Sequence, residues 1–215
     1  MVNYLSVENI SKSYGERILF EEISFGINKD QKIAFVAKNG SGKTSILNII
    51  AGLDMPDNGQ VISRKGIQIS YLAQNDTLDP KRTIKEVVFS SENKTLQVIS
   101  QYNKALEEPE NTDAYQKAFE LMEQHNAWDF DTQYKQILSK LKFDNLEQKV
   151  AELSGGQKKR LSLATILINK PDLLILDEPT NHLDLEMIEW LESYFAKEKI
   201  TLFMVTHDRY FLERV

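Results

Sequence analysis

The alternation of hydrophobic and polar residues predicts strands in the first third of the chain and again toward its end. Residues 4–10 and 22–27 alternate polar and apolar side chains, as half-buried strands do. Residues 32–37 form a short apolar run, which predicts a strand buried on both faces. Further short strands are expected at residues 60–63, 68–72, 173–176 and 201–206.

Apolar residues at helical spacing predict helices between these strands. Four of them place a helix over residues 43–51, packed against a sheet. Ser154 is expected to open a helix that Pro171 ends, and Asp184 is the expected N-cap of a helix that reaches residue 196. Because strands alternate with helices, we expect an α/β fold with right-handed crossovers and a mainly parallel sheet.

The composition changes in the middle of the chain, where Glu, Gln, Lys, Leu and Ala dominate. This segment predicts a helical subdomain inserted into the α/β core, so that the chain divides into residues 1–77, 78–153 and 154–215. The alternative interpretation is a set of solvated linker helices without a function. The helices of this middle segment are expected at residues 84–107, 113–126 and 132–141, with Pro109 between the first two.

The charge balance limits the partners that the chain can have. The 215 residues carry 26 Lys and Arg against 32 Asp and Glu, a formal net charge of -6. An acidic surface argues against nucleic-acid binding over the whole molecule, although a small basic face such as Lys81, Arg82 and Lys85 remains available.

Hydropathy indicates a chain without a membrane span, and the absence of Cys is compatible with a reducing compartment. The longest apolar runs, such as residues 173–176 and 202–205, are far shorter than the roughly 20 residues that a membrane helix needs. The first residues do not resemble a secretory signal. The chain has no Cys, which excludes disulfides and Cys-ligated zinc. We therefore expect a cytoplasmic location.

The strongest local motif is AKNGSGKT, which follows an expected strand and opens an expected helix. Small residues at its centre let backbone N–H groups surround phosphate oxygens, and the helix N-terminus adds a positive dipole end. Lys43 is expected to contact the β- and γ-phosphates, and Thr44 to offer its hydroxyl to Mg²⁺. The usual first Gly of such a loop is Ala37 here, at the strand end. The expected phosphate-binding residues are Ala37, Lys38, Asn39, Gly40, Ser41, Gly42, Lys43 and Thr44.

Two adjacent acids follow the apolar run at residues 173–176. The carboxyl end of a strand in an open α/β sheet is where ligands bind. Asp177 is expected to hold Mg²⁺, usually through water, and Glu178 to polarise an attacking water. Alone, such a pair could equally be an acidic end of a strand.

A third motif, LSGGQ, combines a good N-cap with two glycines in the first turn of a helix. Each Gly disfavours a helix by about 1 kcal/mol, so a helix cap alone would not favour Gly here. The pattern predicts a second anion site at a helix N-terminus. The residues expected to form it are Ser154, Gly155, Gly156 and Gln157.

Together, these motifs resemble those of an ATP-binding-cassette (ABC) nucleotide-binding domain, in the same order from Tyr14 to His207. The resemblance implies a P-loop NTPase fold with an N-terminal antiparallel β subdomain and an inserted helical subdomain. It identifies residues 37–44 with the Walker A loop, residues 154–157 with the signature motif and residues 177–178 with the Walker B pair. It implies ATP and Mg²⁺ as ligands.

Three further residues have a role only through this resemblance. Tyr14 resembles the aromatic residue that stacks on adenine, Gln74 the Q-loop glutamine that senses Mg²⁺ and the γ-phosphate, and His207 the switch histidine that contacts the γ-phosphate. Each has an ordinary alternative. Tyr14 could cap the first hairpin, Gln74 could be a surface loop residue, and His207 could be a core histidine at a strand end.

The sequences EPTNHLD, THDRYFL and LSGGQKKR resemble the ABC-F family more than transporter ATPases. That resemblance implies the first of two cassettes on a longer chain, which acts on the ribosome near the exit tRNA site in translation or antibiotic protection. An end inside a helix after residue 208 fits a truncated cassette.

The partner that the resemblance implies is a second cassette, on the same chain or as a homodimer, because two cassettes together enclose two ATP molecules. The main alternative is the ATPase subunit of a membrane transporter, with the same mechanism and a transmembrane partner. A nucleotide-gated module without catalysis is a third possibility, against which Glu178 and His207 argue.

Overall fold

The computed structural model describes residues 2–36, 40–73, 78–91, 93–108 and 110–215. The chain forms two compact units, Met1–Asp76 with Lys170–Val215, and Thr77–Asn169. The second unit contains the residues 78–153 that we predicted as a helical subdomain and, in addition, residues 154–169.

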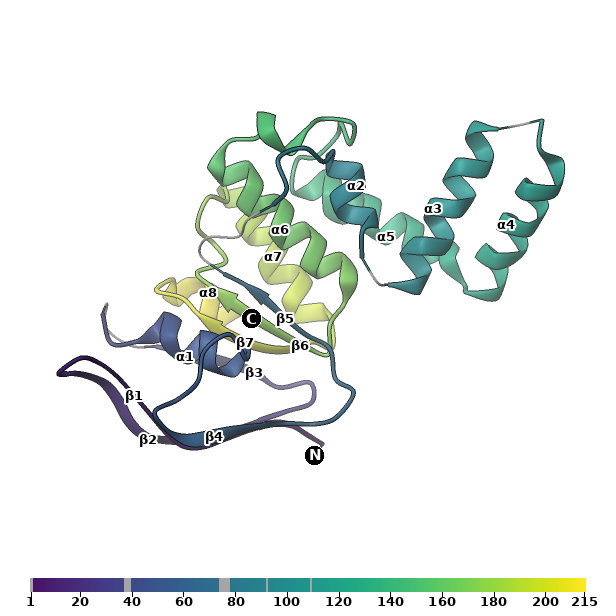
Figure 1. Ribbon diagram of the computed structural model, residues 1–215. Helices are drawn as coiled ribbons and strands as arrows, with labels where there is room; N and C mark the ends of the chain where they lie inside the picture. Colours follow the sequence, from purple (N-terminus) through teal and green to yellow (C-terminus); the bar gives the residue numbers. More distant parts are fainter. Residues whose placement is uncertain (1, 37–39, 74–77, 92, 109) are drawn as a thin grey trace. The chain divides into compact units, whose positions relative to one another are not determined.

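Two sheets build the first unit (Figure 1). One is antiparallel with the strand order β2-β1-β4, and the other is parallel with the order β3-β7-β6-β5. The predicted combination of a parallel core with an N-terminal antiparallel sheet is therefore confirmed. The strands are β1 (Asn3–Tyr14), β2 (Arg17–Asn28), β3 (Lys32–Phe35), β4 (Asn58–Ser63), β5 (Ile69–Leu72), β6 (Leu173–Asp177) and β7 (Thr201–Val205).

Helix α1 (Lys43–Ile50) lies between the two sheets and joins them into one core (Figure 1). Its apolar residues Ile46 and Leu47 are completely buried, in a cluster that includes residues from both sheets. The rings of Phe25 on β2 and Phe203 on β7 stack with their centroids 5.4 Å apart, so the sheets also meet directly. Complete burial of an Ile, Leu or Phe side chain contributes roughly 1.5–3 kcal/mol to the free energy of unfolding.

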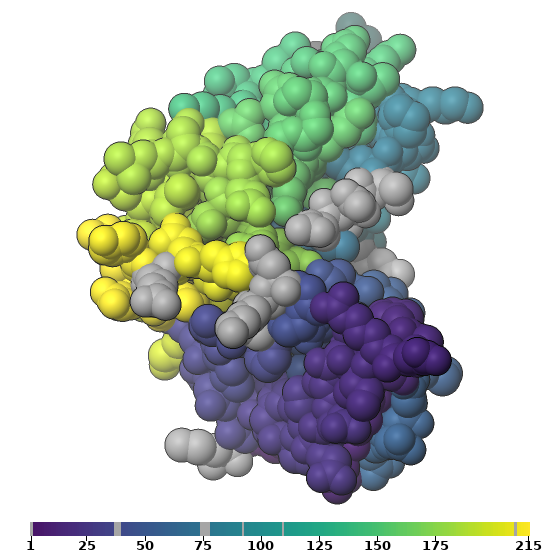
Figure 2. Space-filling model, turned by 90° about the vertical axis from the view of Figure 1, so that its left-hand side faces the viewer, coloured from purple at the N-terminus to yellow at the C-terminus, as the bar shows by residue number. Residues whose placement is uncertain are grey.

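The parallel pairing brings distant segments of the sequence to one edge of the sheet. β6 and β7 are buried along their whole lengths, and their register pairs Asp177 with Val205. β3 pairs with β7 so that Phe35 is also opposite Val205. On one face of the molecule, Figure 2 shows the yellow C-terminal residues beside the purple and blue N-terminal ones. The segments that follow β3, β6 and β7 therefore start at the same edge.

The expectation that residues 32–37 form a strand buried on both faces was wrong. β3 is an edge strand with β7 as its neighbour, and Ala34 is exposed. The ammonium group of Lys32 donates to the carbonyl of Phe195, at the end of helix α7 (Leu185–Lys197). A short apolar run therefore does not distinguish a central strand from an edge strand.

Helix α7 and the short helix α8 (Arg209–Arg214) complete the first unit. Asp184 caps α7 as predicted, because its carboxylate accepts from the backbone N–H of Met187 at 3.1 Å. The rings of Phe195 and Phe211 meet edge to face at 6.3 Å and hold the two helices together.

The second unit is helical, but its helices differ from the predicted ones. The single helix expected at residues 84–107 is two helices, because Asn93 accepts hydrogen bonds from the N–H groups of Thr95 and Leu96 and so starts a new helix. The third expected helix starts at residue 127 rather than 132. The helices are α2 (Ile84–Phe89), α3 (Lys94–Glu107), α4 (Thr112–Gln124), α5 (Ala127–Lys140), η1 (Val150–Glu152) and α6 (Gly155–Asn169).

Within the described ranges, we find no helix with both the length and the apolar character that crossing a membrane would require.

Two buried tyrosines, one in each unit, should lose their protons late in an alkaline titration. Burial raises the pKa of Tyr134 in the second unit, and of Tyr194 in the first, to about 12, with smaller contributions from the charges of Asp131 and Glu198. In the unfolded chain, both tyrosines lose their protons near the ordinary tyrosine pKa of about 10. The free energy of unfolding therefore falls as the pH rises from about 10 to about 12.

The ultraviolet absorbance of tyrosinate should therefore rise in at least two steps, with a late step near pH 12. The protein unfolded in urea, as control, should titrate in one step near pH 10. A single step near pH 10 for all eight tyrosines of the folded protein would contradict the burial of these rings.

Candidate functional site

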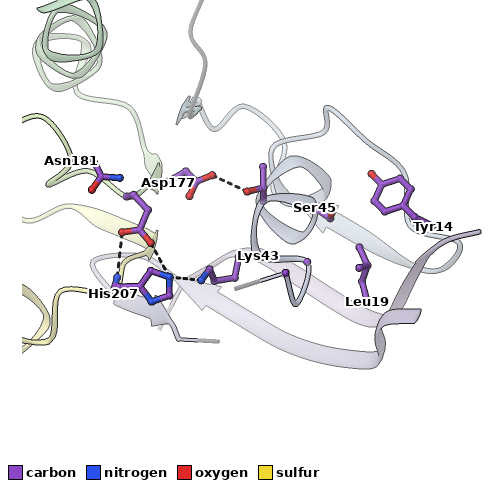
Figure 3. Close-up of a pocket in the computed structure, with 11 residues that line it drawn as sticks. Tyr14, Leu19, Lys43, Ser45, Asp177, Asn181 and His207 are labelled. Carbon is purple, nitrogen blue, oxygen red and sulfur yellow. Dashed lines mark hydrogen bonds and ion pairs between the residues drawn. The ribbon is translucent and has the colours of Figure 1, made fainter. Parts of the chain in front are cut away.

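A cavity of about 630 Å³ opens at the edge of the parallel sheet where β6 and β7 end (Figure 3). It lies in the first unit, and the N-terminus of α1 forms one side of it. Its lining residues are Tyr14, Leu19, Gly40, Gly42, Lys43, Thr44, Ser45, Asp177, Glu178, Asn181 and His207.

The N-terminus of α1 presents backbone N–H groups to the cavity. Gly40 and Gly42 both have a left-handed backbone, with φ values of 76° and 85°. Gly42 is the N-cap and has no side chain that could accept from the first turn of the helix. Backbone N–H groups at a helix N-terminus and the helix dipole make this turn suitable for an anion.

The packing around Gly42 explains why this position has no side chain. A Cβ atom there would lie 2.9 Å from Cβ of Leu19 and 3.1 Å from Cδ1 of Phe20, both on β2. The guanidinium group of Arg17 holds the turn from the same strand, by donating to the carbonyl of Gly40 at 2.8 Å.

Thr44 and Asp177 place two oxygen ligands side by side. The Thr44 hydroxyl donates to Oδ2 of Asp177 at 3.1 Å, although the two residues are 133 positions apart (Figure 3). Asp177 is 2% exposed, so its carboxylate is buried at the bottom of the cavity. Among the described residues, no group of three or more His, Cys, Asp or Glu could hold a metal alone. A hydroxyl and one carboxylate fit Mg²⁺ that also takes oxygens from phosphates and water.

Glu178 and His207 form a second polar group with Lys43. One carboxylate oxygen of Glu178 accepts from the backbone N–H of His207 at 3.2 Å, and the other lies 3.5 Å from Nε2 of the ring. Nζ of Lys43 lies 2.6 Å from the same Nε2 atom (Figure 3). Because an ammonium group can only donate, Nε2 is the acceptor in this contact and the ring proton is on Nδ1.

The backbone of Glu178 is held in a conformation that is rare for a residue with a side chain. Its φ is 49°, in the left-handed region. Its N–H donates to the carbonyl of Val205 at 2.8 Å, which continues the pairing of β6 with β7 by one residue. This geometry turns the carboxylate toward His207, and strained residues of this kind are common at functional sites.

Tyr14 lies at the opposite end of the cavity from His207, as Figure 3 shows. It is the last residue of β1, and 58% of it is exposed. Its ring can therefore offer a flat apolar surface to a ligand.

The structure brings eight of the seventeen predicted site residues together in the cavity. The cavity collects Tyr14, Gly40, Gly42, Lys43, Thr44, Asp177, Glu178 and His207, and Ser41 lies between the two glycines. The predicted residues Ala37, Lys38, Asn39 and Gln74 lie outside the described residues.

The predicted anion site at residues 154–157 belongs to the second unit. The N–H of Ser154 donates to Oε1 of Gln157 at 2.9 Å, and the N–H of Gln157 donates to the Ser154 hydroxyl at 3.3 Å, which is a reciprocal cap of α6. In the part of the chain that the structure describes, nothing excludes a side chain at Gly155, because a Cβ there would meet no atom within 4 Å.

Three lining residues were missed by the sequence analysis: Leu19, Ser45 and Asn181. Ser45 directly follows Thr44, and Asn181 lies in the EPTNHLD stretch, so both were adjacent to predicted residues. No sequence signal indicated Leu19, because its position depends on the pairing of β2 with β1.

Comparison with known proteins gives one family model and several curated relatives. The model described as ABC transporter matches residues 20–181. The uncharacterized ABC transporter ATP-binding protein YfmR of Bacillus subtilis is 42% identical over 221 residues, which cover 100% of this chain and 35% of that protein.

Two other relatives have names that state a family or a process. The energy-dependent translational throttle protein EttA of Mycobacterium tuberculosis is 34% identical, with 98% of this chain and 39% of that protein covered. ABC transporter F family member 2 of Arabidopsis thaliana is 35% identical, with 97% of this chain and 33% of that protein covered. The chain thus spans between 33% and 39% of the length of these three relatives.

Among solved structures, the ATP binding subunit of an ABC transporter has the same fold. Its TM-score is 0.72 at 20% identity, with 98% of this chain and 82% of that chain covered.

The tight packing at Gly42 leads to a prediction about stability. Gly42→Ala and Gly66→Ala both place a methyl group on a left-handed residue, with φ of 85° and 83°. This strain costs about 1–2 kcal/mol in each variant. Gly66 has open space, whereas a methyl group at Gly42 meets Leu19, so Gly42→Ala should lose about 1–3 kcal/mol more. Urea unfolding measures both variants, and equal losses would contradict the described packing around α1.

Proposed function

The chain belongs to the ABC transporter family of ATP-binding domains, and from this membership we propose that it binds ATP with Mg²⁺ in the described cavity and hydrolyses it. The observation that carries the proposal is the convergence of Lys43 and Thr44 from α1 with Asp177, Glu178 and His207 from the ends of β6 and β7.

The two ends of the cavity match the two ends of ATP. The N–H groups at the start of α1 and the ammonium group of Lys43 would bind the phosphates. The exposed ring of Tyr14 would stack on the adenine. Thr44 and Asp177 would hold Mg²⁺, which when bound neutralises charge that develops on the phosphate oxygens.

Hydrolysis requires a group that accepts a proton from water, and Glu178 is placed for that role. As a water attacks the γ-phosphorus, the bond from that phosphorus to the oxygen shared with the β-phosphate breaks, and Glu178 takes up the proton. Lys43 would exchange its contact with Nε2 of His207 for the γ-phosphate, and the ring, once its proton is on Nε2 rather than Nδ1, would donate to that phosphate.

The signature residues support a partner cassette. Gly155 lies in the first turn of α6, where Gly is unfavourable by about 1 kcal/mol, and no contact with the described residues excludes a side chain there. A ligand or partner that must come close to the backbone at Gly155 would explain why this residue has no side chain. We infer that Ser154, Gly155, Gly156 and Gln157 contact the γ-phosphate of an ATP that a second cassette holds, on the same longer chain or in a homodimer.

The cellular role that the comparisons support is that of an ABC-F protein, with this chain as the first of its two cassettes. The relatives include an F family member and a protein named as a translational throttle, and the chain has the EPTNHLD and LSGGQKKR sequences. The proposal extends to the cytoplasm as location and to the ribosome as partner.

Replacing the proposed base should separate binding from hydrolysis. Glu178→Gln should bind ATP with unchanged affinity. It should hydrolyse ATP at least about 100-fold more slowly than the wild type, because a general base contributes roughly 10²–10⁴-fold. Calorimetry measures binding and phosphate release measures hydrolysis. Glu186→Gln, which is exposed and does not line the cavity, is the matched control.

Two results would count against parts of this assignment. Wild-type turnover by Glu178→Gln would exclude Glu178 as the base, and full ATP affinity in Lys43→Ala would contradict the phosphate-binding role of α1. Glu178→Gln in the longer protein should also cosediment with ribosomes in ATP but not in ADP; equal sedimentation in both would refute the ribosomal role alone.

Replacing Gly155 should test the partner cassette. Gly155→Ala should leave the folded protein equally stable, or more stable by about 0.5–1 kcal/mol, because Ala favours a helix. ATP affinity of the single cassette should not change, whereas hydrolysis by the paired cassettes should fall. If paired turnover stays at the wild-type rate, the inferred contact between cassettes is wrong.

A further inference from the structure

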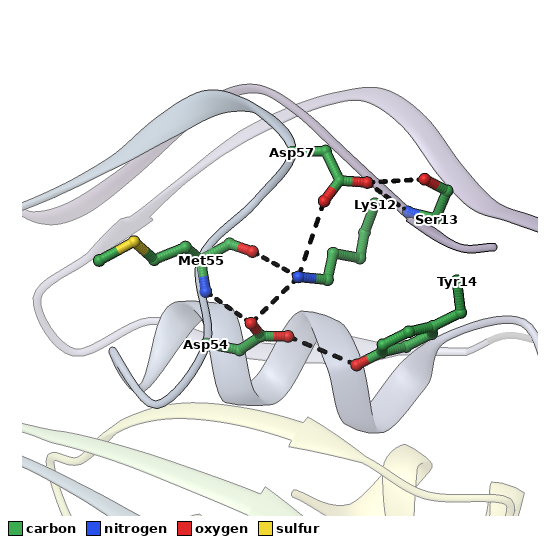
Figure 4. Close-up of polar contacts among 6 residues, drawn as sticks. All are labelled: Lys12, Ser13, Tyr14, Asp54, Met55 and Asp57. Atoms are coloured by element: carbon green, nitrogen blue, oxygen red, sulfur yellow. Dashed lines mark hydrogen bonds and ion pairs between the residues drawn. The ribbon is translucent and has the colours of Figure 1, made fainter.

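An ammonium group is buried next to the cavity, among two carboxylates and a carbonyl (Figure 4). Lys12 on β1 is only 9% exposed. Its Nζ donates to Oδ1 of Asp54 at 3.0 Å and to the carbonyl of Met55 at 2.6 Å, and lies 3.8 Å from Oδ1 of Asp57. Burying a long cationic side chain is costly unless it is paired, as it is here.

This cluster, consisting of Lys12, Asp54, Met55 and Asp57, fastens the end of β1 to the loop after α1. Asp57 accepts from both the N–H and the hydroxyl of Ser13, each at 2.7 Å. Asp54 accepts from the N–H of Met55 at 2.7 Å. The loop follows the C-terminus of α1, whereas the proposed phosphate site is at its N-terminus. The cluster and the phosphate site are therefore attached to opposite ends of one helix.

All three charges of the cluster are stabilised by their neighbours. The hydrogen bond to Asp54 raises the pKa of Lys12. The bond from Lys12 lowers the pKa of Asp54, and the hydroxyl of Ser13 lowers the pKa of Asp57. The cluster thus keeps its charges, and its geometry, through the neutral pH range.

Tyr14 is the cavity residue that the cluster contacts. The Tyr14 hydroxyl donates to Oδ2 of Asp54 at 3.5 Å, and Nζ of Lys12 lies over the ring, 5.7 Å from its centroid (Figure 4). An ammonium group over an aromatic face is attracted by the negative charge density of that face. Because Tyr14 is 58% exposed, these contacts hold a ring that otherwise has much rotational freedom.

We propose that Lys12 and Asp54 are positioning residues. They orient the Tyr14 ring, at the end of the cavity where adenine would bind, before a nucleotide binds. This inference rests on the proposed function, in which Tyr14 stacks on the adenine of ATP. Neither Lys12 nor Asp54 lines the cavity, so their effect on ATP passes through Tyr14. Fixing the ring in advance removes part of the entropy that binding would otherwise lose.

A double-mutant cycle tests this path. Lys12→Met and Asp54→Asn should each weaken ATP binding about fivefold, the lower end of the contribution of base–aromatic stacking. In a Tyr14→Ala background, the same substitutions should change the affinity less than twofold, because the ring through which they act is absent. Calorimetry with ATP and Mg²⁺ measures all six proteins.

Three further variants make the result specific. Lys12→Arg keeps the charge and should restore most of the affinity, and Tyr14→Phe isolates the hydroxyl contact with Asp54. Lys135→Met, which breaks an ion pair with Asp131 and does not line the cavity, should bind ATP like the wild type.

Equal losses in both backgrounds would overturn the proposal and leave Lys12 and Asp54 as a structural fastening of the loop. If Lys12→Met does not fold, Asp54→Asn completes the cycle alone, since it keeps the shape of the side chain. Failure of the proposed function has a different signature, because then Tyr14→Ala alone would leave ATP affinity unchanged, or the wild type would not bind ATP.

Discussion

The pairing of β6 with β7 is the interaction on which the site depends. Both strands are fully buried, and their register carries Asp177 and Glu178 to the sheet edge where Thr206 and His207 also leave the sheet. Parallel strands bring their carboxyl ends to the same edge, so residues from distant parts of the chain meet there. Directly after β6, the backbone of Glu178 turns into the left-handed region.

The same edge concentrates features that do not favour stability. Asp177 is a buried carboxylate, Glu178 has a strained backbone, and the first turn of α1 has N–H groups without a side-chain cap. The core beneath compensates for them: apolar residues of α1 and both sheets form one cluster, and Phe25 stacks on Phe203 across it. A rigid core of this kind can hold a polar edge in one geometry before a ligand arrives.

The sequence predicted the parts of the molecule that local chemistry determines. Thr44 and Asp177 were assigned to one site from strand ends and a glycine turn, and their oxygens lie 3.1 Å apart. The break between α2 and α3 was missed, although six polar residues separate Phe89 from Leu96 and Asn93 caps the second helix. Leu19 was missed for another reason: its place in the cavity depends on long-range pairing, which no local pattern encodes.

Two glycines illustrate how structure and sequence contribute different evidence. At Gly42, a left-handed backbone and the contact with Leu19 explain within the chain why a side chain is absent. At Gly155, the backbone is helical and the space is open, so folding of this chain gives no reason for Gly. A residue that the fold does not require, in a helix turn that it disfavours, is best explained by something that approaches the backbone from outside. The structure therefore adds to the sequence motif a contrast between the two glycines, and this contrast supports the proposal of a second cassette.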